Sequence, residues 1–448
     1  MLTLTEAAGQ IRSLRLSPLE LTRDCLARLE RLNPTLNAFI SVMADSALEE
    51  ARRDEAELLA GNWRGPLHGI PIGLKDLLDT AGVRTTAASN QFRERVPLED
   101  AALVRQLTAA GAVILGKQNL HEFAFGMSGV VSAFGPVKNP WDTTRITGGS
   151  SSGSAAAVAS GMCLAAIGTD TAGSIRCPSA LCNLVGLRPS AGALSADGMI
   201  PLSRTFDTAG PIARTAEDAA VLMQAVGALP PDISLSESIA HLKVGLPAPG
   251  FFDDLEPGVK ACIDSALAVI GALVVEVRDV RLEISRSRTI FDAEIYEYHE
   301  PLLQAHPERY DPHTLARVRG CAGISATDYI RARRELDEAR RAAELIFRDV
   351  DVVITPTVPV EAPLLAELEP LGEPDLRQFE TKYLLRNTVP FSVLYWPSAS
   401  VPCGFTSGGL PVGMQISAKP GSDGLVLRLA HAYQQATDWH KREPRIGS

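Results

Sequence analysis

The sequence GGSSSGSAAAVASGMCLAAIGTDTAGSIR, residues 148–176, alternates glycine- and serine-rich turns with two short apolar runs. Ala155–Ala159 predicts a buried helix and Leu164–Ile167 predicts a buried strand, because both runs are apolar. These runs distinguish the stretch from a low-complexity linker, although it stays rich in Gly, Ser, Ala and Thr as far as residue 198. A helix and a strand between such turns indicate an α/β layered fold.

Upstream of this stretch, helices precede the first predicted strand. Residues 4–60 predict helices. The apolar segment 69–76 (GIPIGLKD) predicts a short strand that ends at Lys75. Residues 101–110 then predict a helix, and residues 112–115 predict a buried strand. The N-terminal half therefore changes from helices alone to alternating helices and strands.

Downstream, the alternation continues into the C-terminal half. Residues 229–242, which contain the pair Pro230-Pro231, predict a linker between a core and a C-terminal part. We expect strands at 244–246, 274–277, 350–354, 398–401 and 412–416, and helices at 258–273 and 326–347.

The length of 448 residues gives a soft expectation of roughly three domains. Large α/β enzymes, however, often build one body around one sheet. We therefore predict a single domain over residues 1–448. Its parts are an N-terminal helical segment (1–62), a core that carries the glycine-rich turns (63–228), and a C-terminal part that completes the sheet and a substrate pocket (229–448).

The composition argues against several classes of protein. The net charge is −10, whereas a nucleic-acid backbone needs a basic stripe, so we expect no nucleic-acid partner. No run of about 18 apolar residues occurs, so we expect no membrane span. The seven cysteines are widely spaced and form no Cys-x-x-Cys pair. This pattern fits a reducing cytosol better than a disulfide scaffold or a zinc site, and it predicts a cytoplasmic protein.

A lysine and two serines carry the chemistry that the residues themselves suggest. A serine hydroxyl is a weak nucleophile that needs a base, and no histidine lies near either glycine-rich turn. A lysine serves instead if burial lowers its pKa. Lys75 has apolar sequence neighbours that favour such burial: Ile72, Leu74, Leu77 and Leu78. Consecutive N–H groups in the turn at 171–174 can form an oxyanion hole.

Three segments together resemble the amidase signature family: GIPIGLKD at 69–76, GGSSSGS at 148–154 and GTDTAGSIR at 168–176. The spacing between Ser150 and Ser174 matches the spacing of the two catalytic serines in that family. Two late segments, PSASVPCG and LPVGMQI, also resemble family segments. The resemblance therefore covers most of the chain, and the three-part combination is far more specific than any single part.

The resemblance implies a role for each site residue. Ser174 is the nucleophile, Ser150 is a bridging serine whose preceding peptide bond is cis in the family, and Lys75 is the base. The oxyanion hole consists of backbone N–H groups from Thr171, Ala172, Gly173 and Ser174. The segment expected to contact the substrate comprises Gly126, Met127, Ser128 and Gly129. The residues expected to organise the loops are Ser151, Asp170 and Arg176.

The resemblance also implies a fold, namely a large mixed β-sheet covered on both faces by helices, and a site that needs no cofactor and no metal. Two positions depart from the family pattern. Ser152 replaces a usual glycine, and Ala172 replaces the glycine before Gly173. Because both replacements are small, we expect the chemistry to be retained.

Two other motifs are not favoured. Residues 149–153 match Gly-x-Ser-x-Gly, the nucleophile elbow of α/β-hydrolases, but that motif needs a strand directly before it, and residues 139–145 are a poor strand. Residues 111–117 resemble a phosphate-binding loop, yet the next residue is Gln118 rather than the Ser or Thr that would bind magnesium.

The predicted function is an amidase that converts a small-molecule carboxamide to a carboxylic acid and ammonia or an amine. Ser174 forms the acyl-enzyme, and a homo-oligomer is compatible with this hypothesis. The alternative is a glutaminase-type subunit of a tRNA-dependent amidotransferase complex, which shares these motifs and releases ammonia for a partner. A third hypothesis is a catalytically inactive relative. The intact Lys75, Ser150 and Ser174 argue against it.

Overall fold

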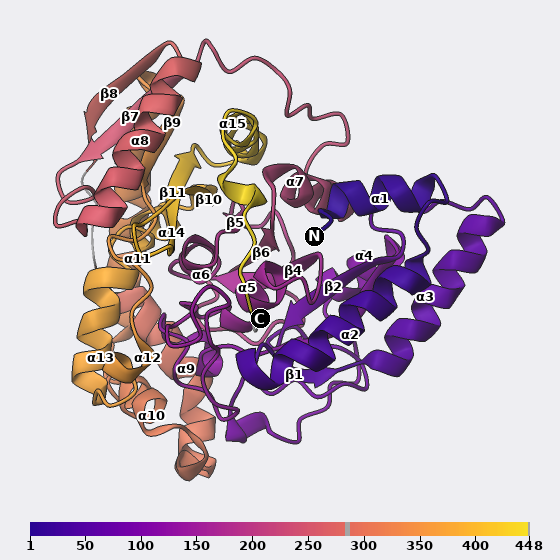
Figure 1. Cartoon of the computed structure of the whole chain (residues 1–448). Helices are drawn as coiled ribbons and strands as arrows, with labels where there is room; N and C mark the ends of the chain where they lie inside the picture. The colour runs from indigo at the N-terminus through magenta and orange to yellow at the C-terminus, as the bar shows by residue number, and fades with distance from the viewer. Residues whose placement is uncertain (283–286, 447–448) are drawn as a thin grey trace.

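The computed structural model describes residues 1–282 and 287–446 (Figure 1). The helices of the chain pack around one mixed β-sheet. Within the described residues, eleven strands lie in the order β1-β3-β2-β4-β6-β5-β10-β11-β9-β7-β8. β2 is parallel to β3 and β4, and β7 is parallel to β8 and β9. The other neighbours are antiparallel. The predicted α/β class with a mixed sheet is confirmed.

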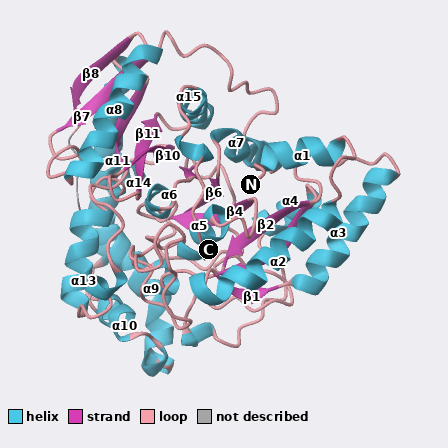
Figure 2. Cartoon of the chain, in the orientation of Figure 1, coloured by secondary structure: helices cyan, strands magenta, loops and turns pink. Residues whose placement is uncertain are grey.

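The strands are, in chain order, β1 (Phe39–Val42), β2 (Ile70–Lys75), β3 (Ala112–Gln118), β4 (Ala165–Asp170), β5 (Val185–Arg188), β6 (Thr208–Ala213), β7 (Lys243–Ala248), β8 (Glu276–Arg281), β9 (Val352–Pro356), β10 (Ser398–Phe405) and β11 (Pro411–Ala418). Figure 2 shows them crossing the molecule from β8 at one edge to β1 at the other.

The α-helices are α1 (Leu4–Arg12), α2 (Pro18–Leu36), α3 (Ala44–Leu59), α4 (Ala102–Ala109), α5 (Ser152–Ala159), α6 (Arg176–Leu181), α7 (Ala216–Ala225), α8 (Pro257–Leu273), α9 (Thr289–Ala305), α10 (Pro312–Arg319), α11 (Ala326–Ala343), α12 (Leu365–Leu368), α13 (Glu373–Phe379), α14 (Val389–Val393) and α15 (Asp423–Gln435). Short 3-10 turns join several of them, and a π-helical turn, η5 (Glu380–Leu384), follows α13.

The central strands are buried on both faces of the sheet. Every residue of β2, β3, β4 and β6 is buried. Because successive side chains of a strand point to opposite faces, complete burial requires cover on both sides. Helices supply that cover: α2, α3 and α5 pack on the first strands, and α6, α8 and α15 pack on β10 and β11. The edge strand β8 has no fully buried residue.

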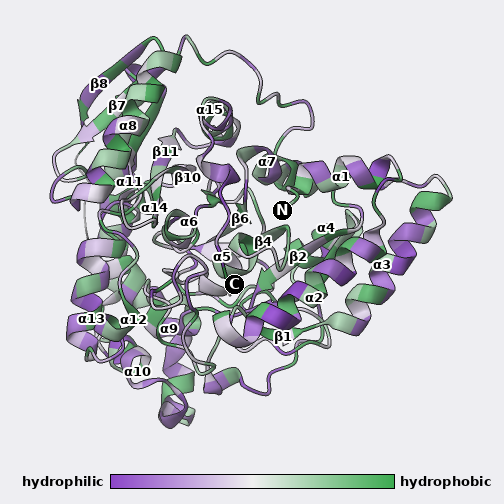
Figure 3. Cartoon of the chain, in the orientation of Figure 1, coloured by the Kyte–Doolittle hydropathy of each residue, from purple (hydrophilic) through white to green (hydrophobic). Residues whose placement is uncertain are grey.

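The peripheral helices are amphipathic, as their sequences require. Ser17 caps α2 by accepting hydrogen bonds from two backbone N–H groups, and Pro18 occupies the first helical position. On α3, the buried face includes Ala47, Ala51 and Leu58, while most of its charged residues face solvent. Figure 3 shows the resulting mixture of hydrophilic and hydrophobic bands on α2 and α3. No helix among the described residues is long and apolar enough to cross a membrane.

The observed elements differ from the predicted ones at several positions in the chain. The helical segment 4–60 is interrupted by the short edge strand β1. β5 and β6 were not predicted, because Gly, Pro and Arg weaken the apolar pattern of VGLR and TAGPIA. Several helices were not predicted either, namely α6, α7, α9, α10, α12, α13, α14 and α15. Residues 229–242 contain no helix or strand, as a linker would.

Substitutions of Trp396 test the packing of a small hydrophobic core around β9. Trp396 is fully buried between Phe347 and Phe391, with ring centroids 4.5 and 5.9 Å away. Its indole Nε1 has no hydrogen-bond partner among the described residues. We expect Trp396→Ala to lower the free energy of unfolding by about 3–5 kcal/mol because it leaves a cavity. Trp396→Phe should lower it by clearly less, because the phenyl ring fills most of the cavity and the indole Nε1 has no hydrogen bond to lose. Urea denaturation measures both, and equal losses would contradict this explanation.

Candidate active site

Lys75 ends β2 inside the protein, with no solvent-exposed surface. Its Nζ donates hydrogen bonds to Ser150 Oγ and Thr169 Oγ1, both at 2.7 Å. Burial lowers the pKa of Lys75 to about 7, although the negative charges of Asp170 and Asp207 raise it in part. Near neutral pH, a substantial fraction of this lysine is therefore an uncharged amine that can accept a proton.

The Ser150 loop, residues 148–154, lies beside the carboxyl ends of the paired strands β2 and β4. The Gly149–Ser150 peptide bond is cis, and the Ser150 carbonyl accepts a hydrogen bond from the His121 N–H at 3.1 Å. Ser151 joins this loop to its neighbours. Its Oγ donates to the Thr169 carbonyl at 3.1 Å and accepts from the Thr169 N–H at 3.2 Å, and its own N–H donates to the Ser174 carbonyl.

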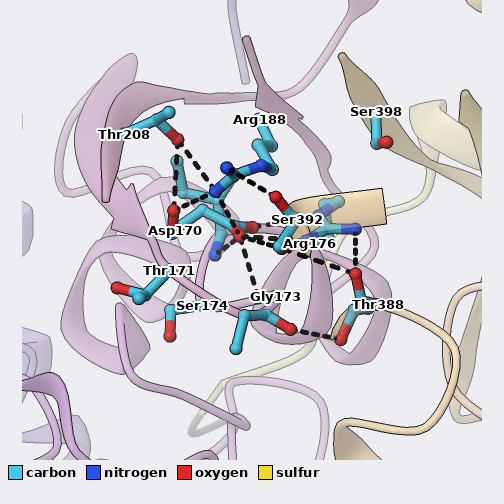
Figure 4. Close-up of polar contacts among 12 residues, drawn as sticks. Asp170, Thr171, Gly173, Ser174, Arg176, Arg188, Thr208, Thr388, Ser392 and Ser398 are labelled. Atoms are coloured by element: carbon cyan, nitrogen blue, oxygen red, sulfur yellow. Dashed lines mark hydrogen bonds and ion pairs between the residues drawn. The ribbon is translucent and has the colours of Figure 1, made fainter. Parts of the chain in front are cut away.

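The Ser174 loop, residues 170–176, is organised by one buried carboxylate. Asp170 accepts hydrogen bonds from Arg176 Nε at 3.0 Å and Nη2 at 2.9 Å, and from the Gly173 N–H at 2.8 Å. Arg188 Nη1 lies 3.3 Å from the same carboxylate and also donates to the Asp170 carbonyl. Figure 4 shows these contacts, with Asp170 between the two arginines.

The pKa of Asp170 is lowered by this environment. Burial by itself would raise the pKa, but the charges of Arg176 and Arg188 and the donated hydrogen bonds outweigh it. Asp170 is therefore ionised at neutral pH, and its hydrogen bonds fix the shape of the loop that follows β4. Two of the predicted loop-organising residues, Asp170 and Arg176, lie in this network, whereas Ser151 bonds the backbone of the neighbouring Thr169.

Ser174 is almost completely buried, at 2% exposure, and its Oγ faces Met127. In the described part of the chain, this Oγ makes one hydrogen bond, to Met127 Sδ at 3.5 Å, and none to Ser150. The structure thus joins Lys75 to Ser150 but leaves the next link, from Ser150 to Ser174, unmade. Hydrogen bonds between candidate catalytic groups are often absent or long without substrate.

Three backbone N–H groups of the Ser174 loop are free within the described residues, namely those of Thr171, Ala172 and Ser174. The fourth candidate donor, the Gly173 N–H, is taken by Asp170. Gly173 has a φ of +134°, which favours glycine, and an added Cβ would collide with the Thr388 side chain. Thr388 Oγ1 also donates to the Ala172 carbonyl at 2.7 Å and so holds the turn.

A cavity of about 200 Å³ opens beside Ser174. Thr171, Ala172 and Ser174 line one side, together with two of the four predicted substrate-contacting residues, Gly126 and Met127. The other two, Ser128 and Gly129, do not line the cavity. Their N–H groups donate to the Glu380 carboxylate and to His121 Nδ1 instead.

Glu380 and Arg317 form a buried pair behind this segment that no sequence motif indicated. Arg317 Nη1 donates to Glu380 Oε2 at 2.9 Å. Glu380 Oε1 accepts from the N–H groups of Met127 and Ser128 at 3.0 and 2.8 Å, so it holds the segment at the cavity wall. The π-helical turn that places Glu380 has no distinct sequence pattern that could have revealed it.

One cluster of metal-ligating residue types occurs among the described residues, formed by Asp54, Glu57 and His68. Arg64 forms ion pairs with both carboxylates. The His68 nitrogens face the Asp54 carbonyl at 2.8 Å and the Arg64 N–H at 3.3 Å. A metal ion there would have to displace the Arg64 guanidinium, and the contacts of this cluster join α3 to the segment before β2.

Comparison with known proteins identifies the protein family of the chain. The family model described as Amidase matches residues 20–298 and 305–427. Together with the α/β fold, this match defines an enzyme that acts on carbon–nitrogen bonds of amides. The chain belongs to the amidase signature family, as the three sequence segments indicated.

Individual relatives are similar along their whole length. A glutamyl-tRNA(Gln) amidotransferase subunit of Hahella chejuensis is 38% identical, and the match covers 99% of each chain. The solved peptide amidase of Stenotrophomonas maltophilia is 31% identical with a TM-score of 0.84, covering 100% of this chain and 99% of that one. A solved chain from a vestigial protein complex, linked to the origins of an s-triazine catabolic enzyme, is 30% identical with a TM-score of 0.88, and the match covers both chains completely.

A substitution of Asp170 tests how much its buried ion pairs with Arg176 and Arg188 contribute to stability. We expect Asp170→Ala to lower the free energy of unfolding by about 3–5 kcal/mol, because Arg176 and Arg188 would remain buried without their anion. Guanidinium denaturation measures this loss. Asp264→Ala, which breaks the exposed pair with Lys260, is the control and should change little. Equal effects of the two substitutions would contradict the importance of the buried charges.

Proposed function

We propose that this chain hydrolyses a carboxamide through an acyl-enzyme on Ser174, with Ser150 and Lys75 moving the proton. The observation that carries the proposal is the 2.7 Å hydrogen bond between Lys75 Nζ and Ser150 Oγ in a fully buried setting. Because burial lowers the pKa of Lys75 to about 7, the pair can accept a proton at neutral pH.

The proposed reaction starts when Ser174 Oγ attacks the amide carbonyl. Its proton passes to Ser150 Oγ while the Ser150 proton passes to Lys75 Nζ. The negative charge that develops on the carbonyl oxygen is stabilised by the free N–H groups of Thr171, Ala172 and Ser174. The proton then returns through Ser150 to the leaving nitrogen as the carbon–nitrogen bond breaks. Water cleaves the ester by the same route and releases the carboxylic acid.

This reaction requires Ser174 to turn from Met127 towards Ser150. The sulfur contact at 3.5 Å is a weak hydrogen bond. A substrate carbonyl that enters the cavity would replace the contact, and the Ser174 side chain would then move to another staggered rotamer. Met127 thus holds the nucleophile in a resting orientation in this proposal, and substrate binding completes the chain of hydrogen bonds.

A second candidate is a glutaminase-type subunit of a tRNA-dependent amidotransferase. It is favoured by the curated relatives named as glutamyl-tRNA(Gln) amidotransferase subunits, which are 34–38% identical over nearly all of both chains. The chemistry at Ser174 would be the same, but the ammonia would pass to a partner. Ammonia release by the purified chain from simple amides, with no second subunit present, would rule against a required partner.

The nucleophile and the base are tested by fluorophosphonate labelling with peptide mass mapping. We expect the adduct on Ser174, and we expect Lys75→Met to slow labelling by about 10²-fold or more, because a general base is lost. Lys138→Met, at a lysine that is only half-buried, is the control and should label at the normal rate. An adduct on Ser151, or undiminished labelling of the Lys75 variant, would contradict the mechanism.

The pH dependence of kcat/KM is expected to follow the protonation state of Lys75. Only the uncharged amine accepts a proton, so we expect kcat/KM to rise with pH and to level off above about 7. Because the negative charge of Asp207 raises the pKa of Lys75, Asp207→Asn should move the midpoint to lower pH. Initial rates between pH 5 and 9 measure both profiles. A midpoint that moves upward would show that another group controls the rate.

A further inference from the structure

The far wall of the cavity beside Ser174 is positively charged. Four of its lining residues are arginines: Arg288, Arg317, Arg377 and Arg386. Glu380 is the carboxylate that lines it among the described residues. Apolar side chains such as Phe291, Leu385 and Val389 form much of the remaining lining. A substrate in this cavity therefore meets guanidinium groups on an otherwise largely apolar surface.

The negative charge of Glu380 is already paired with the buried guanidinium of Arg317. Oε1 accepts from the Met127 and Ser128 N–H groups and from the Ser128 hydroxyl at 2.6 Å. Oε2 accepts from Arg317 Nη1 at 2.9 Å. A positively charged group of a ligand would find no other carboxylate on the described cavity wall.

Two of the arginines, in contrast, have donors to spare. Arg317 is 3% exposed, and its Nη2 has no hydrogen-bond partner among the described residues, whereas Nε and Nη1 are bonded to Glu373 and Glu380. A buried guanidinium N–H pair without an acceptor is costly unless a ligand supplies one. Arg377 is half-buried, and the described residues offer its side chain no carboxylate within ion-pair distance.

We infer that the substrate is an amide whose acyl part carries a carboxylate and no ammonium group, such as the monoamide of a dicarboxylic acid. The carboxylate accepts hydrogen bonds from Arg317 Nη2 and Arg377, and the apolar walls contact the carbon chain between it and the scissile amide. This inference rests on the proposed hydrolysis at Ser174. It excludes free glutamine as the substrate. The ammonium group of glutamine would lose its hydration in the cavity without forming an ion pair with a carboxylate.

The experiment compares ammonia release from three primary amides of equal chain length. Glutaramate carries the carboxylate, pentanamide has a methyl group in its place, and L-glutamine adds an ammonium group beside the carboxylate. We expect kcat/KM for glutaramate to exceed the values for both others at least about tenfold. Added salt should weaken the advantage over pentanamide, because it screens the charge interaction. Equal rates for glutaramate and glutamine would overturn the exclusion of the ammonium group.

The variant Arg377→Gln tests the arginine directly. We expect it to lower kcat/KM for glutaramate much more than kcat/KM for pentanamide, and so to remove most of the advantage of glutaramate. Arg319→Gln is the matched control. It removes one positive charge from an exposed position of α10, the helix that carries Arg317. A merely structural role of Arg377 would lower both rates together, and that outcome would overturn the inference.

Binding to Ser174→Ala, measured by calorimetry, separates this inference from the proposed reaction. We expect this variant to bind glutaramate and to bind L-glutamine at least about tenfold more weakly. Hydrolysis of pentanamide without a preference for glutaramate would overturn the inference and leave the proposed function intact. Binding of glutaramate without labelling or hydrolysis at Ser174 in the wild-type chain would support the subsite and overturn the proposed function. Absence of glutaramate binding would overturn the inference in either case.

Discussion

The buried ion pairs of Asp170 hold the candidate site together. Asp170 ends β4, and its arginine partners lie in α6 and β5. Arg176 also donates to the Thr388 carbonyl at 2.9 Å and to Gln415 Oε1 at 2.7 Å, so the same charges reach α14 and β11. The loop that carries Ser174 is thereby joined to segments more than two hundred residues away. A buried charge network of this kind fixes the loop only while every member has its partners.

Asp170 orders the Ser174 loop and also affects the pKa of Lys75. Its negative charge, with that of Asp207, raises the pKa of Lys75, while burial lowers it further than these charges raise it. The balance places the lysine pKa near 7, where both protonation states are populated. Burial in the sheet between β3 and β4 therefore makes the lysine a suitable base, and the nearby anions keep it protonable.

The sequence predicted the parts of the site that depend on short-range patterns. The strand before Lys75, the helix after Ser150 and the strand before Asp170 all follow from local apolar runs and glycine-rich turns. Glu380, Arg317 and Thr388 could not be found in this way, because they reach the site only through the packing of α10, α13 and α14. The strands β5 and β6 were missed for a related reason. Their Gly, Pro and Arg residues form buried strands only because the neighbouring strands supply the hydrogen bonds.

Whole-chain sequence identity says little about the substrate, because the residues that line the cavity reach it through long-range packing rather than through local sequence motifs. The residues proposed to transfer protons and the Ser174 loop come from the core, where the resemblance to the family is strongest. The cavity wall that faces the substrate comes largely from α9, α10 and the segment from α13 to α14. A whole-chain identity of 38% to an amidotransferase subunit therefore supports a shared fold and reaction class more strongly than a shared substrate. We infer the substrate instead from the cavity wall itself, where Glu380 is paired with Arg317 and Arg317 Nη2 has no hydrogen-bond partner among the described residues.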